Sequence, residues 1–411
     1  MARTRNRKWV ILFGSFLVYL FDALEIAVLS FTLPAIMEDF QISSVEAGLL
    51  ATATLLGMGC SGIIMGWLAD NHGRKTALIT CMVLFIALTS IVYVVPNFEL
   101  LILLRFLAGI GLGGVWSILS TYVVESWPAH QRGKAVAFVL AAFPIGGVVA
   151  AQLAGALMPD WRLLFLVAGL SAVLPLVVVL ALFSESQAWL EQRRFQKAER
   201  VPVSEIFAPG LLRVTVFASL VASFAFVAYY GATTWLPSYL AQERGMDPQT
   251  VSQYMTWLNL GMFVGYIAFG WLADRIGKKL ALTVSLLGTG VLMPMYGLAS
   301  DHTVLIWLGP LYAFFMAFAG LFGSYLGELY PTNIRATGAG FCFNIGRGVS
   351  AFAPMALGGV AVAASLGFGL VVSGLIFLLA ALFMLFLPKA PSDDRTVSTD
   401  SLEGVARATN R

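Results

Sequence analysis

Two segments of the chain, residues 66–78 and residues 270–282, carry nearly the same sequence. They read GWLADNHGRKTAL and GWLADRIGKKLAL, and nine of the thirteen positions are identical. A second set of residues recurs 203 positions further on, where Glu125, Pro128, Arg132 and Phe138 are matched by Glu328, Pro331, Arg335 and Phe341. Because the offset is about half of the 411-residue chain, the repeat predicts two structural halves with the same topology.

The composition places both halves in a membrane. Hydrophobic residues make up 59% of the chain and charged residues only 11%, which is unlike a soluble domain. Apolar runs of about 20 residues are long enough to cross a bilayer core of about 30 Å. The net charge of +3 is small, and the Lys and Arg are not gathered on a candidate binding module, so we expect no nucleic-acid partner.

We predict an all-α integral membrane protein with twelve transmembrane helices in two pseudo-symmetric six-helix bundles. The bundles occupy residues 1–184 and 213–387, with a cytoplasmic linker at 185–212 and a cytoplasmic polar tail at 388–411. The predicted helices cover residues 9–33, 47–68, 77–95, 99–124, 134–157, 162–184, 213–240, 250–272, 280–299, 303–326, 338–362 and 366–387.

The basic residues predict the orientation. Of the 25 Lys and Arg, 21 fall in the two tails, the linker and the loops on that same side. Basic loops remain in the cytoplasm, so we expect both termini inside a plasma membrane, the inner membrane if the source is bacterial.

Residues for catalysis or metal binding are scarce. Cys60, Cys81 and Cys342 lie in separate predicted spans without paired spacing, and His, Cys and carboxylates form no cluster in the sequence. Neither a nucleophile elbow nor a phosphate-binding loop is present. We therefore expect no enzyme activity, no metal and no cofactor.

Four charged residues lie inside predicted spans: Asp22, Glu25, Arg105 and Arg347. A charge at mid-bilayer costs about 2.5–3.5 kcal/mol on insertion scales, so such residues mark candidate functional sites. Asp22 and Glu25 are three residues apart and share a helix face. Arg105 lies at a similar depth, so these three residues form one polar cluster if the first and fourth helices touch. The alternative is a purely structural salt bridge between those helices.

Several motifs resemble the major facilitator superfamily over the whole chain. The repeated loop resembles its G-x-L-A-D-x-x-G-[RK]-[RK] signature, and Arg105 with Gly109 and Gly111 resembles its R-x-x-x-G-x-G motif. FSESQAWL at 183–190 is similar to the PESxxWL segment of sugar porters and organic-acid relatives, with Ser184 in place of the leading Pro. DALE at 22–25 resembles the D-G-x-D motif of aromatic-acid:proton symporters, from which Ala23 and Glu25 depart. The segment 335–348 resembles the eleventh helix of aromatic-acid and sialate carriers.

This resemblance implies a twelve-helix carrier that works by alternating access. Arginine remains charged, so the carboxylates must bind the coupling proton. We assign Asp22 or Glu25 as the proton acceptor, and Arg347 as the bidentate clamp for a substrate carboxylate. Arg105 suits either role. Further substrate contacts are expected from Asn344, Tyr229, Tyr230, Trp235, Asn259 and Gln152, although each alone is more often a helix-packing or interface residue.

The repeated loops predict a cytoplasmic gate. Gly73 and Gly277 permit a tight turn between helices, and the neighbouring cations can pair with Glu125 and Glu328. Such pairs at the cytoplasmic face are expected to lock the halves together when the cavity opens outward, whereas the alternative role is only to anchor topology. The complete predicted gate consists of Asp70, Gly73, Arg74, Glu125, Arg132, Asp274, Gly277, Lys278, Glu328 and Arg335.

The favoured function is proton-coupled uptake of a small organic anion, an aromatic or aliphatic carboxylate, by a functional monomer in a lipid bilayer. A neutral sugar or polyol:proton symporter is the first alternative, because of the sugar-porter-like segment at 183–190. A drug:proton antiporter is a weaker alternative, since FPIGG at 143–147 only partly matches G-P-x-x-G-G. A non-transporting sensor with the same fold is the fourth possibility.

Overall fold

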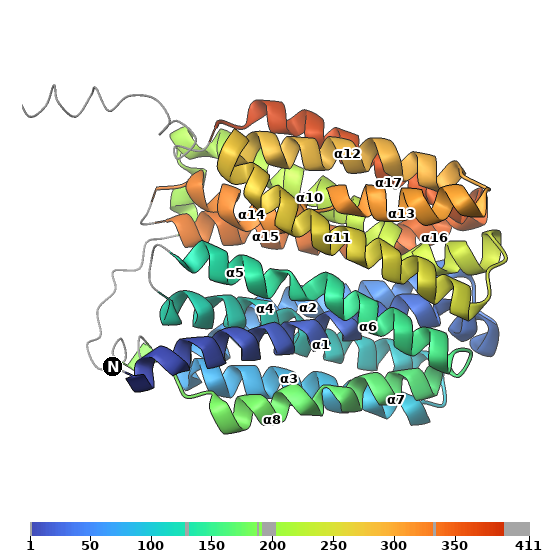
Figure 1. Ribbon diagram of the computed structural model, residues 1–411, viewed down its shortest axis with the longest axis horizontal. Helices are drawn as coiled ribbons and strands as arrows, with labels where there is room; N and C mark the ends of the chain where they lie inside the picture. Colours follow the sequence, from blue (N-terminus) through green and yellow to red (C-terminus); the bar gives the residue numbers. More distant parts are fainter. Residues whose placement is uncertain (1, 128–130, 187–188, 191–202, 332–333, 390–411) are drawn as a thin grey trace, which may run out of the picture.

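A computed structural model describes residues 2–127, 131–186, 189–190, 203–331 and 334–389 of the protein. All regular elements in these ranges are helical, and twelve of the helical segments are long and apolar enough to cross a membrane. The helices run roughly along the long axis of the molecule (Figure 1). The end at which α1 begins is termed the terminal end, and the opposite end is termed the far end.

The first half contains α1 to α8. Its fifth and sixth spans are each built from two consecutive helices, α5 with α6 and α7 with α8. The elements are α1 (Ala2–Phe40), α2 (Ser44–His72), α3 (Arg74–Ile91), the 3-10 helix η1 (Val92–Val94), α4 (Phe98–Ser126), α5 (Arg132–Leu140), α6 (Ala142–Leu157), α7 (Trp161–Ser171) and α8 (Val173–Leu182).

The second half contains α10 to α17. Its tenth and eleventh spans are again divided, into α13 with α14 and α15 with α16. The elements are η3 (Val203–Phe207), α10 (Pro209–Ser238), the π-helix η4 (Tyr239–Glu243), α11 (Pro248–Ile276), α12 (Lys278–Leu298), α13 (His302–Phe315), α14 (Phe318–Glu328), α15 (Arg335–Ser350), α16 (Ala353–Ala363), α17 (Leu366–Phe383) and η5 (Met384–Phe386).

Helices that begin at the far end have polar N-caps. The Ser43 side chain accepts from the amide of Glu46 while the Glu46 carboxylate accepts from the amide of Ser43, which is a capping box. Side-chain oxygens also cap α4, α7, α11, α13 and α17, from Asn97, Asp160, Asp247, Asp301 and Ser365. These caps satisfy amide groups that a helix leaves unpaired at its first turn.

The largest boundary difference is at α1, which continues to Phe40 instead of ending at residue 33. Pro34 lies inside this helix and removes one backbone hydrogen bond. The residues beyond it are nevertheless packed, since Ile36 is fully buried. Burial of the turn after Pro34 therefore stabilises the helix by more than the missing hydrogen bond at Pro34 destabilises it.

The surface of the bundle is apolar, as a lipid-facing surface must be. Trp67 and Trp271 occupy equivalent positions in the repeated segment, and both are more than half exposed. Trp307 and Leu298 are exposed to a still greater degree, 76% and 70%. Contiguous exposure of such side chains in water would favour association, whereas in a bilayer it matches the solvent.

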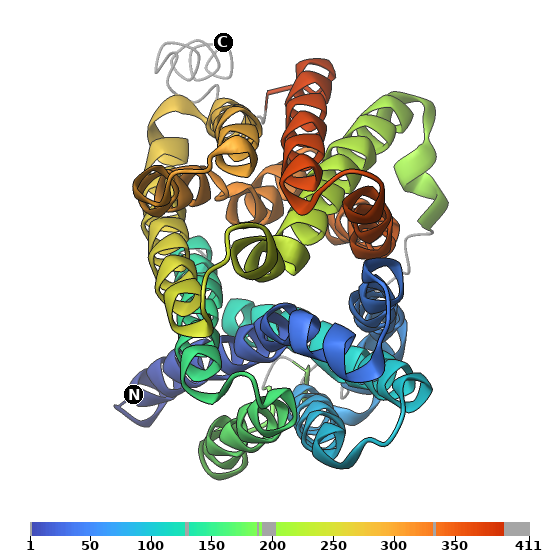
Figure 2. The same cartoon turned by 90° about the vertical axis from the view of Figure 1, so that its right-hand side faces the viewer.

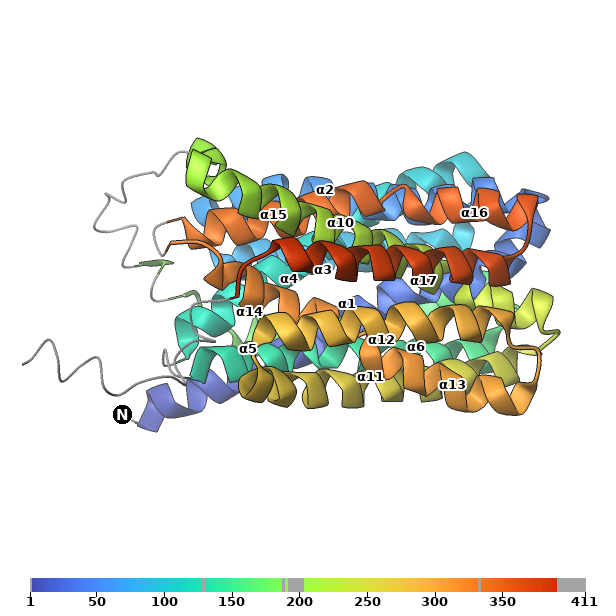
Figure 3. The ribbon, with the colours of Figure 1, turned by 90° about the horizontal axis from the view of Figure 1, so that it is seen from above.

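The two halves pack closely at the far end. Seen from that end, α1 to α8 form one group and α10 to α17 the other (Figure 2). Between them, α2 packs on α16 and α6 packs on α11, and α2 and α16 also lie side by side in Figure 3. A Cβ added to Gly48 would lie 2.7 Å from the Met355 Cα, and one at Gly358 would lie 2.4 Å from the Ser44 carbonyl oxygen. Glycine is required for this backbone-to-backbone approach.

Contact between the halves is much weaker toward the terminal end. There α2 faces α15 rather than α16 and packs on it far less, and α5 packs far less on α11 than α6 does. On α2, Gly59, Gly62 and Gly66 have no other atom within contact distance of an added Cβ. The described residues therefore form a conformation that is closed at the far end and spread at the terminal end.

Candidate functional site

A small cavity of about 90 Å³ lies between the two halves. It is lined from the first half by α1, α2 and α6, and from the second by α10 and α11. Its walls are mainly apolar, and its polar side chains are Ser30, Thr54, Tyr229, Tyr230, Thr233, Thr234 and Asn259. A site at the boundary between repeats is where carriers of this construction bind their substrates.

Asp22 and Arg347 belong to different halves, and each is an electrostatic neighbour of the other. Asp22 on α1 is 2% exposed, and its strongest charged neighbour is Arg347 on α15. No direct salt bridge joins them among the contacts of described residues. The Arg347 Nη2 atom donates to the Tyr230 hydroxyl at 3.3 Å. Asp22 and Arg347 thus bring charges of the two halves near each other, a combination that the sequence did not predict.

Glu25 and Arg105 form a second pair within the first half. Both side chains are fully buried, and each is the other's main charged neighbour. The Arg105 Nε atom donates to the Thr54 hydroxyl at 3.3 Å, and its guanidinium lies 5.4 Å from the centre of the Phe165 ring. Among the described residues, both Arg105 terminal nitrogens lack a hydrogen-bond partner, and the Glu25 carboxylate has the Thr89 hydroxyl beside it, at a geometry too poor for a regular hydrogen bond.

The four intramembrane charges are therefore neighbours, with Arg347 of the second half next to the three residues, Asp22, Glu25 and Arg105, for which one polar cluster is predicted. Asp22 interacts with Glu25 as well as with Arg347, so the order is Arg347, Asp22, Glu25, Arg105. Buried charges without hydrogen-bond partners are costly. Such a row is suited to exchanging a proton or an anion, since either one neutralises a charge that the protein leaves unsatisfied.

The sequence analysis missed two tyrosines beside this row. Tyr19 on α1 interacts electrostatically with Asp22 and Arg347, and Tyr266 on α11 interacts with Tyr19 and Tyr230. The signal for Tyr19 was available, because it lies three residues before Asp22 and so on the same helix face. Tyr266 could not be found in this way, since it is brought near only by the tertiary packing of α11 on α6, which in turn packs on α1.

Three of the six predicted substrate contacts line the cavity: Tyr229, Tyr230 and Asn259. The rings of Tyr229 and Tyr230 meet edge to face at 5.2 Å. The Asn259 amide donates to its own helix at the Met255 carbonyl, 2.8 Å away, and its side chain packs over Gly147 of α6.

The other three predicted contacts lie elsewhere. Trp235 is buried with its indole nitrogen donating to the Pro354 carbonyl at 2.8 Å, so it joins α10 to α16. Gln152 is exposed and donates to the Thr256 hydroxyl at 2.7 Å, joining α6 to α11. Asn344 is exposed on α15 and does not line the cavity. Its spacing of three from Arg347 therefore does not place it in the site.

Four methionines line the same cavity and were not predicted. They come from α2, α11 and the junction between α13 and α14: Met58, Met255, Met262 and Met316. A thioether side chain is flexible and polarisable and packs well on unsaturated groups. Nothing in the sequence separates these four from the other ten methionines of the chain.

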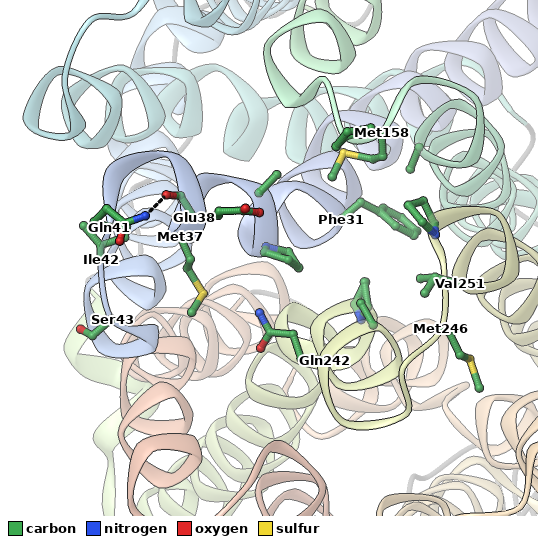
Figure 4. Close-up of a pocket in the computed structure, with 17 residues that line it drawn as sticks. Phe31, Met37, Glu38, Gln41, Ile42, Ser43, Met158, Gln242, Met246 and Val251 are labelled. Carbon is green, nitrogen blue, oxygen red and sulfur yellow. Dashed lines mark hydrogen bonds between the residues drawn. The ribbon is translucent and has the colours of Figure 1, made fainter.

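A larger cavity of about 750 Å³ opens at the far end (Figure 4). It lies between the far ends of α1 and α6 in one half and η4 and the start of α11 in the other. Its only charged lining residue is Glu38, and Pro34 and Pro237, which match in the repeat, both contribute to its wall. Phe31 lines both this far cavity and the central cavity.

The predicted gate residues lie at the terminal end, where two ion pairs form. Arg74 lies 3.7 Å from Glu125, and Lys278 contacts Glu328. The first pair joins α3 to α4 and the second joins α12 to α14, so each lies within one half. In this conformation, which is spread at the terminal end, neither pair bridges the two halves, because the loop and the helix end that supply each pair belong to the same bundle. The lock expected when the cavity opens outward stays a prediction.

The two turn glycines of the predicted gate both have a positive φ angle, as expected for tight turns in the repeated loops. Gly73 has φ +103° and Gly277 has φ +88°, which side chains rarely adopt. The Glu185 carboxylate seats against Gly73 and accepts from the amide of Arg74 at 2.8 Å. Glu185, in the segment 183–190, is therefore a contact of two predicted gate residues, Gly73 and Arg74, and was not itself predicted.

The remaining gate residues are scattered. Arg132 is exposed and donates to the Trp127 carbonyl at 3.0 Å, while Asp274 is exposed. The side chains of Asp70 and Arg335 lie outside those that the structure describes. Among the described residues, no group of three or more His, Cys, Asp or Glu could hold a metal ion.

Comparisons with known proteins agree with this geometry. A family model for the Major Facilitator Superfamily matches residues 12–341 and 238–408. The chain is 32% identical over 384 residues to the cis,cis-muconate transport protein of Acinetobacter baylyi, covering 91% of this chain and 92% of that protein. It is 31% identical over 349 residues to the sialic acid transporter NanX of Escherichia coli, covering 84% and 85%.

The fold is also that of a solved transporter. A D-xylose–proton symporter superposes with a TM-score of 0.79 at 20% identity, covering 94% of this chain and 99% of that one. Twelve membrane-length helices, two repeated halves and a central cavity between them complete the agreement. The chain therefore belongs to the Major Facilitator Superfamily, and it is a multi-pass membrane transporter rather than an enzyme.

Proposed function

We propose that this transporter takes up a small organic anion, an aromatic or aliphatic carboxylate, together with protons and without a further cofactor. We also propose that the monomer is the functional unit and that both termini are cytoplasmic, so that the far end faces outward. The observation that carries the proposal is that Asp22 and Arg347, from different halves, are charged neighbours, and that Arg347 donates to Tyr230, which lines the central cavity although neither charged residue lines it itself.

The proposed mechanism is a competition for Arg347. A substrate carboxylate binds the guanidinium in two parallel hydrogen bonds, as planar arginine allows. Asp22 then loses its cation and is left as a buried charge, which a proton neutralises. Because Asp22 and Arg347 belong to different halves, binding both substrate and proton removes an attraction between the halves and permits their rearrangement.

In this mechanism Glu25 stores the proton within the first half, and Arg105 remains charged beside it. Their carboxylate and guanidinium have free hydrogen-bonding capacity among the described residues, so a water molecule or a proton can be accommodated there. Glu25 is one helical turn from Asp22. A proton can thus pass between the two carboxylates without crossing apolar protein.

The similar proteins support the substrate class. Two are transporters for cis,cis-muconate and sialic acid, and a third relative is the niacin transporter NiaP of Acinetobacter baylyi, 28% identical over 370 residues, covering 82% of this chain and 83% of that one. All three names denote acids. An arginine near a mainly apolar cavity with several methionines suits an acid with an unsaturated body.

Uptake by purified protein in liposomes tests the proposal. With a panel of carboxylates and an imposed proton gradient, Arg347→Gln is expected to abolish uptake, since it removes the clamp. Arg347→Lys keeps the positive charge but loses the two parallel donors of the guanidinium, and it is expected to weaken the affinity for the carboxylate substrate by about tenfold or more. Full uptake by Arg347→Gln would contradict the proposal and favour the neutral sugar or polyol symporter.

A further inference from the structure

We propose that the ring of Phe31 is the barrier that separates the far cavity from the central cavity. This inference rests on the proposed function only in taking the far cavity as the route to the substrate site. Phe31 is the one residue that lines both cavities among those described, and its side chain is 6% exposed. The ring therefore occupies the wall between two spaces that a substrate must pass through in succession.

The opposite wall comes from the other half. Leu236 lines the central cavity and the next residue, Pro237, lines the far cavity, so α10 crosses the boundary at this peptide. In the repeat Pro237 matches Pro34, which lies on α1 one turn beyond Phe31 and also lines the far cavity. The barrier is thus built on the pseudo-symmetric parts of the first and seventh spans.

Both helices have weakened backbones at this level. Pro34 cannot donate to the carbonyl of residue 30, and Pro237 cannot donate to that of residue 233. Directly after Pro237 the helix widens into the π-helix η4, a form frequently found at functional sites. These breaks let the far segments of α1 and α10 tilt while the buried charges below them stay in place.

The closed far-end interface explains why one aromatic ring is sufficient. The close glycine contacts of α2 with α16 seal that flank, and Gly155 of α6 packs on Ser252 of α11 at the other flank. Only the space along α1 and α10 remains, and there the far cavity of about 750 Å³ ends at Phe31. Removing the ring should connect the cavities without separating the halves.

Cysteine accessibility tests this directly. Thr233, which lines the central cavity, is replaced by Cys in a chain that also carries Cys60→Ser, since Cys60 is exposed whereas Cys81 and Cys342 are buried. A membrane-impermeant thiol reagent is added to the far side of oriented vesicles. Phe31→Ala is expected to raise the labelling rate several-fold, and Phe31→Trp to leave it unchanged or lower it.

Two controls separate the barrier from general loosening. Phe143→Ala opens the central cavity alone and Met37→Ala enlarges the far cavity alone, so neither should raise labelling. If Phe31→Ala does not fold, Phe31→Leu, which keeps an apolar side chain, is used in its place. Its labelling rate is expected to lie between those of the parent and Phe31→Ala. Equal labelling of the parent, Phe31→Ala and Phe31→Leu would overturn the proposal. The assay needs neither substrate nor proton gradient, so it stands or fails separately from the proposed function.

Discussion

At the scale of single residues, the two buried carboxylates of α1, Asp22 and Glu25, are distinguished by their partners. Asp22 faces an arginine of the other half, whereas Glu25 faces an arginine of its own half. Because they are three residues apart, they share a helix face, but their neighbours on other helices differ. They should therefore contribute differently to transport, with Asp22 linked to substrate binding and Glu25 linked to the proton.

Replacing Glu25 by Gln should uncouple transport from the proton gradient. The amide fills the same space but cannot carry a negative charge, so gradient-driven accumulation is expected to fall to the level of passive exchange. Exchange of labelled for unlabelled substrate across liposomes should persist, since Arg347 is untouched. Accumulation that still follows the gradient in Glu25→Gln would exclude Glu25 as a proton carrier.

Replacing Gly73 by Ala should destabilise the protein. A residue with a Cβ at φ +103° and ψ 154° is strained by about 1–3 kcal/mol, and the new methyl group would meet the Glu185 carboxylate at 2.2 Å. The melting temperature in detergent should drop measurably. Gly270→Ala is the matched control, because its Cβ meets no atom within contact distance, and a similar drop there would contradict the argument.

At the scale of elements, the far-end interface is made mainly by the close packing of whole helices, to which the Gln152–Thr256 hydrogen bond between α6 and α11 is added. The pairs α2 with α16 and α6 with α11 occupy equivalent places in the two halves, and each approaches closely through glycine. Because a lipid bilayer supplies little driving force between apolar helices, such close packing is a main source of helix association. The far-end closure should therefore be sensitive to added volume.

Gly48→Leu is expected to shift the protein away from the far-closed conformation. The added side chain would collide with the Met355 backbone of α16. Spin labels placed on the far ends of α2 and α16 should report a longer distance by pulsed electron resonance, and the transport rate should fall. Gly59→Leu, also on α2 but meeting no atom in this conformation, should leave the far-end distance unchanged, and an equal shift of that distance in both variants would contradict this account.

At the scale of the whole molecule, the two terminal-end ion pairs should act as independent units. Arg74 with Glu125 and Lys278 with Glu328 stabilise separate halves. Alanine substitutions within one pair should be strongly non-additive in unfolding free energy, whereas Arg74→Ala combined with Lys278→Ala should be additive within about 0.5 kcal/mol. Thermal unfolding in detergent measures both cycles. A large coupling between the pairs would show that they bridge the halves after all.

Much of the architecture follows from the sequence alone, because a bilayer requires every backbone polar group to be satisfied within a helix. Apolar runs gave all twelve spans within a few residues, except where α1 continues past Pro34. The half-chain repeat predicted the turns at Gly73 and Gly277, since a positive φ is a local property of the backbone. The four buried charges were also identifiable, because a charge in an apolar run has a recognisable cost.

Only the tertiary structure decided which of these residues meet. Arg347 lies near Asp22, and each gate ion pair lies within one half. Trp235, Gln152 and Asn344 do not line the cavity. The tertiary structure also brought Tyr266, four methionines and Phe31 to the path between the halves. Hydrophobic periodicity specifies where a helix lies in the membrane, but the rotation and neighbours of that helix depend on packing against helices that are distant in the chain.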